Sequence, residues 1–564
     1  MMEATKTIDA ETRNRLIDRY HVIDGPTLRK LVGASLEWLR TNQQIVNSLN
    51  VFPVPDGDTG TNMVLTMQSA QDEATDEGQR NIGPVAHAVA HGALMGARGN
   101  SGVILSQLWR GFARALDNHD VLDAQTLANA LQEARETAYK GVVRPVEGTI
   151  LTVSKDIAIC AHQAVNDGVT STFELLELVV EAADQSVKHT PELLPVLKEA
   201  GVVDSGGKGL FFILEGMLRS AYRQPLDQPL AAVKPLSVLA IEGASHAVEP
   251  GQDWEVVVDF RPNGSLDIED FYAQLEELGT SIQLGEGDGM YRMHIHVADN
   301  TEYKPIDYIR ELGTVTNVAI ENLMVQVESG AEKASREELR LQPVEPGQVA
   351  VVTVAPGPGI ARVFSSLGVN AIIEGGQTMN PSTQEILSSF EDLPTNKVVI
   401  LPNNKNIILA AQQAAELTVK EVEVVPSVSV PQGIAALFAW EPTGDFETML
   451  EAMRENMDEV QFAEITTATR SVEIQGVKVE NGQVIGLLNG KLTSSGDSLQ
   501  EILMEILEKG HASEHELITL YYGEDLSASA ANQITDHIRE VYPELEVELH
   551  QGGQPHYQII LSIE

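Results

Sequence analysis

Two aspartates flank a single glycine in the polar loop over residues 50–62, which contains Asp56, Gly57 and Asp58. Carboxylate oxygens are ligands that Mg²⁺ prefers, and the backbone amides at the start of a helix bind phosphate. Small hydroxyl and amide side chains follow the aspartates, at the point where an apolar helical pattern begins. The loop therefore predicts a magnesium-nucleotide site. A plain Pro-Asp-Gly turn with an ordinary helix cap explains the same residues when this loop is considered alone.

Three further loops of similar composition lie within the first 210 residues, over 96–102, 147–149 and 204–209. Each is rich in glycine and small polar residues, and each adjoins an apolar helical segment. Connections between helices are normally short and varied in composition. Four loops of one kind favour a single composite nucleotide site over four unrelated connections.

The elements that must position these loops are predicted to be helices. Apolar residues recur at helical spacing through the first 225 residues, which predicts an all-helical domain with its polar loops at one end. Met63, Met67 and Ala70 place a helix directly after the Asp56/Asp58 loop, with Thr61 or Asn62 near its cap. The other predicted apolar faces are Leu28, Leu31, Val32, Ser35, Leu39 and Val46; Ile82, Val85, Ala86, Val89 and Ala93; and Ile104, Leu108, Phe112 and Ala115.

The rest of the chain changes character. Residues 226–250 are punctuated by proline and read as a linker. Residues 251–330 follow the order βαββαβ, which predicts a small α+β ferredoxin-like domain. Residues 346–564 are predicted to form a C-terminal α/β domain: short β-branched runs at 349, 371, 397 and 421 alternate with helical stretches, which predicts parallel strands, and the strand patterns near 516, 545 and 557 suggest a second α/β lobe. The amide-rich loops around Gln377, Asn404 and Gln554 suggest a recognition surface, because loops after strand ends line the crevice of an open sheet.

A metal site other than magnesium is suggested by the strand near 290–298. It places Arg292, His294 and His296 on one face, opposite the acidic residues of the first strand of the middle domain. Two histidines and an acid could hold Zn²⁺. A solvated polar face with cross-strand charge pairs is the competing interpretation.

Composition excludes several classes of function. The formal net charge of −44 over 564 residues disfavours binding to nucleic acid or to an anionic membrane surface. There is one cysteine, no long apolar run and no signal-peptide core, so we expect a cytoplasmic protein with no stable membrane insertion. Residues 201–208 resemble a P-loop but lack its lysine in register, and 356–359 is interpreted as a structural turn.

Taken in order and with their spacing, the four N-terminal loops resemble those of the ATP-binding subunit of dihydroxyacetone kinases. A second resemblance, to the bacterial fatty acid kinase catalytic subunits, covers nearly the whole chain. The C-terminal domain of those subunits is DegV-like. The segments that carry this second resemblance are 50–62, 96–107, 145–153, 196–209, 375–383, 401–406 and 552–557.

The resemblance implies an N-terminal extension over 1–24, a helical ATP- and Mg²⁺-binding kinase domain over 25–225, and a partner-binding domain over 346–564. It implies transfer of phosphate from ATP to the carboxylate of a fatty acid that a separate fatty-acid-binding protein presents, and the product is used for phospholipid synthesis. A homodimer of the chain is a possibility that the resemblance leaves open. By motif, Asp56 and Asp58 match the Mg²⁺ carboxylates, and Asn50 is the nearest candidate for a third ligand. The residues that match nucleotide-contacting positions are Thr59, Gly60, Thr61, Asn62, Asn100, Ser101, Gly148, Asp204, Ser205 and Gly206.

A carboxylate acceptor is already ionised, so the reaction needs positioning and charge neutralisation more than a general base. Mg²⁺ supplies the first positive charge, and Arg98 or an arginine of the partner is the candidate for the second. Two alternatives remain: a small-ketone kinase of the dihydroxyacetone type, and a non-enzymatic regulator linked to lipid. The first does not need two additional domains, and the second does not need the aspartates and glycine loops.

Overall fold

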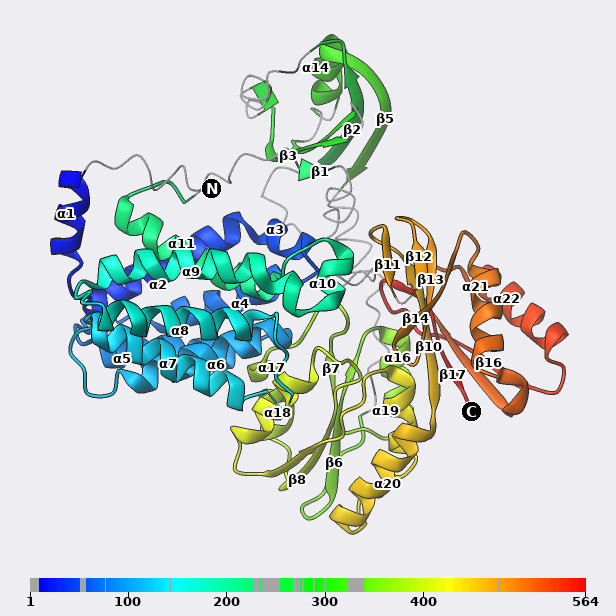
Figure 1. The fold of residues 1–564 in the computed structure, drawn as a ribbon. Coiled ribbons are helices and arrows are strands. Elements are labelled where there is room, and N and C mark those ends of the chain that lie inside the picture. The colour runs from blue at the N-terminus through cyan, green and yellow to red at the C-terminus, as the bar shows by residue number, and fades with distance from the viewer. Residues whose placement is uncertain are drawn as a thin grey trace. The chain divides into compact units, whose positions relative to one another are not determined.

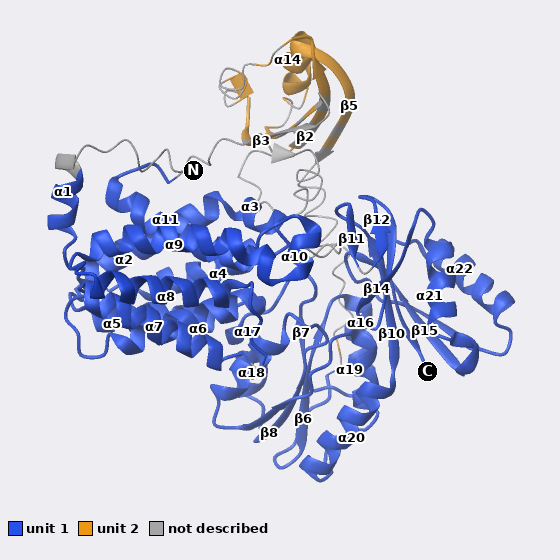
Figure 2. Cartoon of the chain, in the orientation of Figure 1, with its two compact units in different colours: residues 1–227, 340–564 blue, residues 228–339 orange. Residues whose placement is uncertain are grey.

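A computed structural model divides the chain into two compact units, residues 1–227 with 340–564 and residues 228–339 (Figure 2). The structure describes residues 10–50, 57–76, 78–142, 144–226, 341–474 and 476–564. Between 227 and 340 it describes 234–235, 254–264, 266, 271, 274–275, 278–287, 290–298, 301, 303–322 and 339. Among these residues no helix is both long and apolar enough to cross a membrane.

The N-terminal part of the first unit is helical throughout its described residues, as predicted (Figure 1, blue to cyan). Its helices are α1 (Ala10–Arg19), α2 (Gly25–Thr41), α3 (Gln43–Ser48), α4 (Thr59–Glu73), α5 (Ile82–Met95), α6 (Gly99–Ala115), α7 (Ala124–Lys140), α8 (Ile150–Asn166), α9 (Thr172–Leu193), α10 (Pro195–Ala200) and α11 (Ser205–Tyr222).

The predicted apolar faces of α2, α4 and α5 form the core of this domain, whereas in the predicted face of α6 Leu108 is buried and Ile104, Phe112 and Ala115 are only partly buried. Met63, Met67 and Ala70 of α4 are fully buried, and the predicted faces of α2 and α5 are buried along their length. Two boundaries differ from the prediction. Asn42 ends α2 and precedes α3, so Val46 belongs to a second short helix, and α4 begins at Thr59 with Asp58 as its N-cap. A helix pattern reports its apolar face more accurately than its first residue.

The second unit contains the middle domain. Its strands are β1 (Lys234–Pro235), β2 (Trp254–Pro262), β3 (Thr280–Gly287), β4 (Met290–Val297) and β5 (Gly313–Asn322), with α14 (Lys304–Leu312) before β5. The sheet order β1-β3-β4-β2-β5 contains the ferredoxin-like arrangement, with the short β1 added parallel to β3. The first helix of the predicted βαββαβ order, near 266–278, lies largely outside the described residues. Phe260, Phe271 and Ile295 pack in the core on one side of the sheet.

The C-terminal part of the first unit has two sheets. The first is parallel, in the order β7-β6-β8-β9, as the alternation predicted. The second has the order β14-β13-β10-β17-β15-β16 and is mostly antiparallel; strands β11 (Val472–Ile474) and β12 (Val477–Val479) form a separate pair.

The first sheet comprises β6 (Val349–Ala355), β7 (Ala371–Glu374), β8 (Lys397–Leu401) and β9 (Glu421–Val424), with helices α16 (Pro358–Ser366), α17 (Thr383–Glu391), α18 (Ile408–Glu416), α19 (Val430–Leu437) and α20 (Phe446–Glu459). The second comprises β10 (Gln461–Thr467), β13 (Val484–Leu488), β14 (Lys491–Gly496), β15 (Leu517–Tyr522), β16 (Glu546–Gln551) and β17 (Tyr557–Ile563), with α21 (Leu499–Lys509) and α22 (Ala528–Val541).

The helical and C-terminal parts of the first unit share an apolar interface. Helix α18 packs against α6, and α17 packs against α5 (Figure 1). Ala97 and Val103 of the helical part are buried in one cluster with residues of the parallel sheet and its helices, such as Val352 and Ile386. The polar loop before α6 is therefore placed at a boundary between two parts of the chain that are far apart in sequence.

Candidate nucleotide-binding site

The four polar loops meet, because the helices that follow them begin close together. The Ser205 hydroxyl, at the start of α11, donates to the Thr59 hydroxyl at the start of α4, at 3.3 Å. The Asp204 carboxylate accepts backbone hydrogen bonds from Gly207 of α11 and Ile150 of α8. The loop before α6 joins them, since a Cβ added to Gly99 would lie 2.5 Å from the Asn62 side chain. Helices α4, α6, α8 and α11 thus direct their N-termini to one region.

Asp58 lies in this region with only 8% of its surface exposed. As the N-cap of α4 it makes no side-chain capping bond. Its Oδ2 instead accepts a hydrogen bond from the side-chain amide of Asn380, which comes from the C-terminal part. Asp56, the other predicted magnesium carboxylate, lies outside the described residues, and Asn50 is partly buried at the end of the segment that precedes them.

Asn47 of α3 contacts the predicted phosphate loop, and the sequence analysis did not identify it. Its Oδ1 accepts from the Gly60 amide at 2.7 Å and from the Thr61 amide at 3.2 Å, so it satisfies the first turn of α4 from outside the helix. Its Nδ2 donates to the Thr61 hydroxyl at 3.1 Å. Nothing in the local spacing marks Asn47, because its target lies across a loop of about ten residues.

Arg98 and Asn100 face the C-terminal part of the chain. The Arg98 guanidinium donates to the Asn380 carbonyl oxygen at 2.9 Å and pairs with Glu385 at 3.0 Å. The Asn100 side chain donates to Asn406 Oδ1 at 3.4 Å, and Ser101 follows in the first turn of α6. Arg98 thus supplies positive charge at the edge of the site and also connects the site to the loop that carries Asn380.

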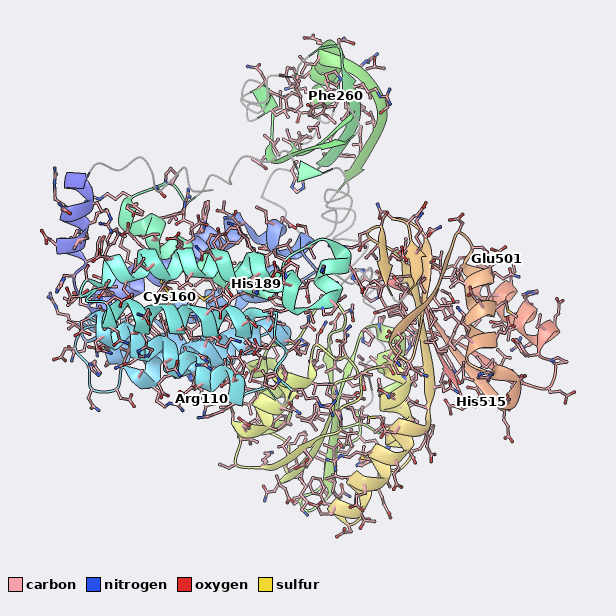
Figure 3. The ribbon with its side chains drawn as sticks, viewed as in Figure 1. Arg110, Cys160, His189, Phe260, Glu501 and His515 are labelled. Carbon is pink, nitrogen blue, oxygen red and sulfur yellow. The ribbon has the colours of Figure 1, made fainter. Side chains whose placement is uncertain are left out.

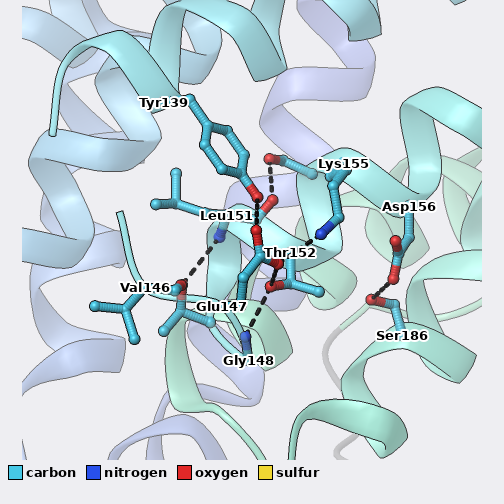
Figure 4. Close-up of polar contacts among 11 residues, drawn as sticks. Tyr139, Val146, Glu147, Gly148, Leu151, Thr152, Lys155, Asp156 and Ser186 are labelled. Atoms are coloured by element: carbon cyan, nitrogen blue, oxygen red, sulfur yellow. Dashed lines mark hydrogen bonds and ion pairs between the residues drawn. The ribbon is translucent and has the colours of Figure 1, made fainter. Parts of the chain in front are cut away.

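The loop before α8 is held by a network around Glu147 (Figure 4). Its carboxylate accepts from Lys155 at 2.5 Å, from Thr152 at 2.7 Å and from Tyr139 at 3.0 Å. These contacts lower the pKa of Glu147 below its ordinary value, and the hydrogen bond from Lys155 is the largest cause. Gly148 has φ +84°, a left-handed conformation that favours glycine, and its amide donates to the Thr152 hydroxyl at 2.8 Å.

Asp204 carries the clearest pKa perturbation among the predicted site residues. Burial raises its pKa to about 6, against the two backbone donors that favour the charged form. Lys208, four residues later, does not face the loops. Its ammonium lies over the rings of Phe211 and Phe212, and burial is the main cause that lowers its pKa. Its position agrees with the absence of a working P-loop lysine.

Three cavities lie among the described residues of the first unit, and each is either small or open. An apolar cavity of about 90 Å³ lies among the helices, lined by Leu108 and Trp109. A second of about 20 Å³ lies at the ends of β6 and β8, next to Glu464, whose pKa burial raises to about 7. An open cleft of about 560 Å³ runs between α6, α7 and α18 and is lined in part by Arg110 (Figure 3) and Arg114.

Several predicted recognition residues instead hold the C-terminal part together. Asn404 donates to Gln377 at 2.8 Å, and Gln554 is buried with its amide bonded to the Tyr521 carbonyl at 2.8 Å. The turn over 356–359 packs on the 552–554 segment, where Gly552 accepts from the Gly359 amide at 2.9 Å.

Cys160 of α8 is half-buried in the helical part, and burial raises its pKa (Figure 3).

The histidines of the middle domain are placed by register. His294 lies opposite Val257 of β2 and Gln283 of β3, while His296 lies opposite Glu255 and Thr280. His296 is only 2% exposed, which differs from a solvated polar face at that position. The side chain of His294 is outside the described part. Within the described residues, no group of three or more His, Cys, Asp or Glu side chains is arranged to hold a metal ion, and zinc binding stays a prediction.

Comparison with known families agrees with this architecture. Residues 53–219 match the DAK2 domain, and residues 249–330 match the middle domain of FakA-like fatty acid kinase proteins. Residues 350–564 match the C-terminal domain of the same proteins. The chain is thus a multidomain protein in which a DAK2 domain is followed by the middle and C-terminal domains of FakA-like fatty acid kinase proteins.

The chain shares 37% identity over 552 residues with uncharacterized proteins of Staphylococcus aureus strains USA300 and MRSA252, covering 96% of this chain and 99% of each relative. It belongs to the FakA-like fatty acid kinase family. Among solved structures, a DegV family protein of Corynebacterium glutamicum is 16% identical, with a TM-score of 0.30 over 38% of this chain and 96% of that one. A fatty acid kinase B3 protein of Streptococcus pneumoniae, loaded with linoleic acid, is 13% identical, with a TM-score of 0.26 over 33% and 76%.

Proposed function

We propose that this protein transfers the γ-phosphate of ATP to the carboxylate of a fatty acid that a separate fatty-acid-binding protein presents. The product is an acyl phosphate, an activated acyl donor for phospholipid synthesis. Membership of the FakA-like fatty acid kinase family supports this proposal. The observation that carries it is the meeting of four helix N-termini beside the buried Asp58 carboxylate.

The helix starts and the carboxylates have complementary tasks. Backbone amides and the positive ends of helix dipoles favour phosphate oxygens, and Thr59, Ser205 and Asn100 add short polar side chains at the same place. Asp58, with Asp56, is proposed to hold Mg²⁺, which neutralises charge on the phosphates. Oxygen donors near Asp58 fit this ion: the carboxylate is buried, and the Asn380 amide that donates to it carries an oxygen with no hydrogen-bond partner among the described residues.

The reaction balances without a general base. A carboxylate oxygen of the fatty acid forms a bond to the γ-phosphorus, the bond from that phosphorus to the bridging oxygen breaks, and ADP leaves with the electron pair. No proton is transferred in this step. Arg98 is proposed to reduce repulsion between the carboxylate and the phosphates, since it brings a fixed positive charge to the edge of the site.

The sizes of the cavities support delivery of the fatty acid by another protein. Pockets for small ligands are usually about 300–1,000 Å³. The apolar cavity of about 90 Å³ and the cavity of about 20 Å³ are far below this range. The open cleft of about 560 Å³ is lined by charged residues such as Arg110, Arg114 and Lys140, which do not suit an acyl chain.

The direct test is product trapping. The full chain is mixed with ATP, Mg²⁺ and a DegV-type fatty-acid-binding protein loaded with a long-chain fatty acid, and hydroxylamine is added to convert acyl phosphate to an acyl hydroxamate. We expect hydroxamate only when the loaded binding protein is present. The same mixture with Asp58→Ala is the matched control.

Two results would contradict the proposal. Rapid phosphate transfer to dihydroxyacetone, without a binding protein, would favour the ketone-kinase alternative. ATP binding without transfer to any acceptor, across several loaded binding proteins, would favour a regulator. Hydroxamate formation that persists undiminished in Asp58→Ala would show that the chemistry occurs elsewhere in the chain.

A further inference from the structure

Asn380 belongs to the C-terminal part of the chain, yet its side chain reaches the predicted magnesium carboxylate. It lies 322 residues after Asp58 in sequence, and its Nδ2 donates a hydrogen bond to Asp58 Oδ2. Asn380 is 2% exposed and Asp58 is 8% exposed, so the two polar groups meet away from bulk solvent. The proposed nucleotide site is therefore not confined to the helical part.

The other end of the Asn380 amide is unusual. Its Oδ1 is buried and has no hydrogen-bond partner within the described part of the chain. Leaving a buried acceptor unsatisfied is destabilising, so such atoms usually have an unseen partner or a function. The oxygen and nitrogen of an amide exchange places by a half-turn of the side chain. In that orientation the amide oxygen, and no longer the nitrogen, lies beside the Asp58 carboxylate.

The loop that carries Asn380 is joined to the helical part by hydrogen bonds. Arg98 donates to the Asn380 carbonyl oxygen at 2.9 Å, and the Thr383 amide donates to the Ala97 carbonyl at 3.1 Å. The capping box of α17, in which Ser382 and Glu385 bond reciprocally, holds the following turn. The Asn380 side chain is thus held next to Asp58 by contacts at its own carbonyl group and at Thr383, three residues later.

We propose that Asn380 is a ligand of the divalent cation bound at Asp58, and that the C-terminal part thereby completes the metal site of the helical part. This inference rests on the proposed kinase function, because it assumes that Asp58 binds the metal. Neutral amide oxygens and carboxylates together are donors for a hard cation. The cation supplies the partner that the Asn380 oxygen lacks, and it replaces the hydrogen bond between amide and carboxylate.

The inference predicts a metal-binding defect that a structural role would not produce. Binding of Mn²⁺, as a probe for Mg²⁺, is measured on the full chain by electron paramagnetic resonance, and ATP binding is measured by calorimetry with and without Mg²⁺. We expect Asn380→Ala to weaken Mn²⁺ binding about 10-fold or more, in the range seen when groups that support a metal are removed. ATP binding without Mg²⁺ should stay at the level of the unaltered chain.

Gln413→Ala is the matched control. Gln413 is a buried amide at the same interface, where it donates to the Ser106 hydroxyl at 3.3 Å and accepts from the Thr383 hydroxyl at 3.1 Å. If Asn380 only helped to dock the two parts, both variants would have the same effect. Asn380→Asp is the second test: it keeps the size and an oxygen ligand, so Mn²⁺ should raise its melting temperature more than that of the unaltered chain.

The outcomes separate this inference from the proposed function. If Asp58→Ala loses Mn²⁺ binding while Asn380→Ala and Asn380→Asp bind it like the unaltered chain, the role of Asn380 is refuted and the metal site at Asp58 stands. If Asp58→Ala itself binds Mn²⁺ normally, both are refuted. Equal losses in Asn380→Ala and Gln413→Ala, with no additional Mn²⁺ effect in Asn380→Asp, would assign Asn380 to docking alone.

Discussion

Replacing Asp204 by asparagine should change how the stability of the helical part depends on pH. Asp204 is the N-cap of α11, accepts from the Gly207 amide at 2.6 Å, and also accepts from the amide of Ile150. Burial raises its pKa from 3.8 to about 6. Asparagine is a comparable N-cap and keeps one acceptor oxygen, but it has no charge to desolvate. The variant therefore removes the charge of residue 204 and keeps its role as the N-cap of α11.

The direction follows from proton linkage. Because the folded pKa is raised, the folded protein binds the proton more tightly than the unfolded chain between about pH 4 and pH 6. The contribution of Asp204 to stability is therefore greatest at low pH and decreases as pH rises through the folded pKa. With values of 3.8 unfolded and about 6 folded, this decrease is about 1.4 kcal/mol between about pH 5 and about pH 7.5. Asp204→Asn removes it.

The assay is urea unfolding followed by circular dichroism at both pH values, with the variant compared with the unaltered chain at each. We expect the stability of the variant, relative to the unaltered chain, to improve by about 1.4 kcal/mol from the lower to the higher pH. Asp123→Asn is the control: Asp123 caps α7, and its pKa is lowered mainly by the Thr126 backbone hydrogen bond, so it stays ionised across this range. The same relative stability of Asp204→Asn at both pH values would refute the reasoning.

Two other predictions concern the charged groups of the site. Asp56→Ala and Asp58→Ala should each lower Mg²⁺-dependent ATP turnover on the order of 10²-fold or more while circular dichroism stays unchanged, because each removes a proposed oxygen ligand of the ion; near-normal turnover would refute the assignment of these two carboxylates. Arg98→Ala should lower transfer about 10-fold or more, whereas Glu385→Gln should lower it less than about threefold, since a half-exposed ion pair contributes little. Equal losses of transfer in Arg98→Ala and Glu385→Gln would indicate that Arg98 only helps to dock the C-terminal part.

Local periodicity predicted the main elements of each part, but not the mostly antiparallel second sheet of the C-terminal part or the added strand β1 of the middle domain. The buried faces of α2, α4 and α5 follow directly from apolar spacing, because a helix in a bundle must bury one side. The strand and helix order of the middle domain led to its sheet arrangement, and short β-branched runs led to the parallel strands of the C-terminal part. These features depend on residues that are close together in the sequence, so their pattern can be read from one sequence alone.

The contacts that complete the site could not be predicted in this way. Asn47 reaches Gly60 across a loop, and Asn380 reaches Asp58 across most of the chain. Neither pairing leaves a periodic signal, because both depend on how separately folded elements meet. Ala97 and Val103 illustrate the same limit: they are ordinary apolar residues beside a helix start, and only the structure shows that they pack against the C-terminal sheet.

The shared interface has a consequence for how the proposed kinase couples its parts. Arg98 contacts the Asn380 backbone, and the Asn380 side chain contacts Asp58, so docking of the C-terminal part and occupation of the metal site involve the same few atoms. Whatever free energy the docked loop adds to metal binding, the metal must add to docking, since linkage between two binding events is reciprocal. If Asp58 and Asn380 bind the metal as proposed, a metal-nucleotide complex there favours the arrangement in which the C-terminal loop is in place. If the C-terminal part also receives the acyl-carrying partner, the kinase is most completely assembled when nucleotide is already bound, which restricts phosphate transfer to the partner-bound acceptor.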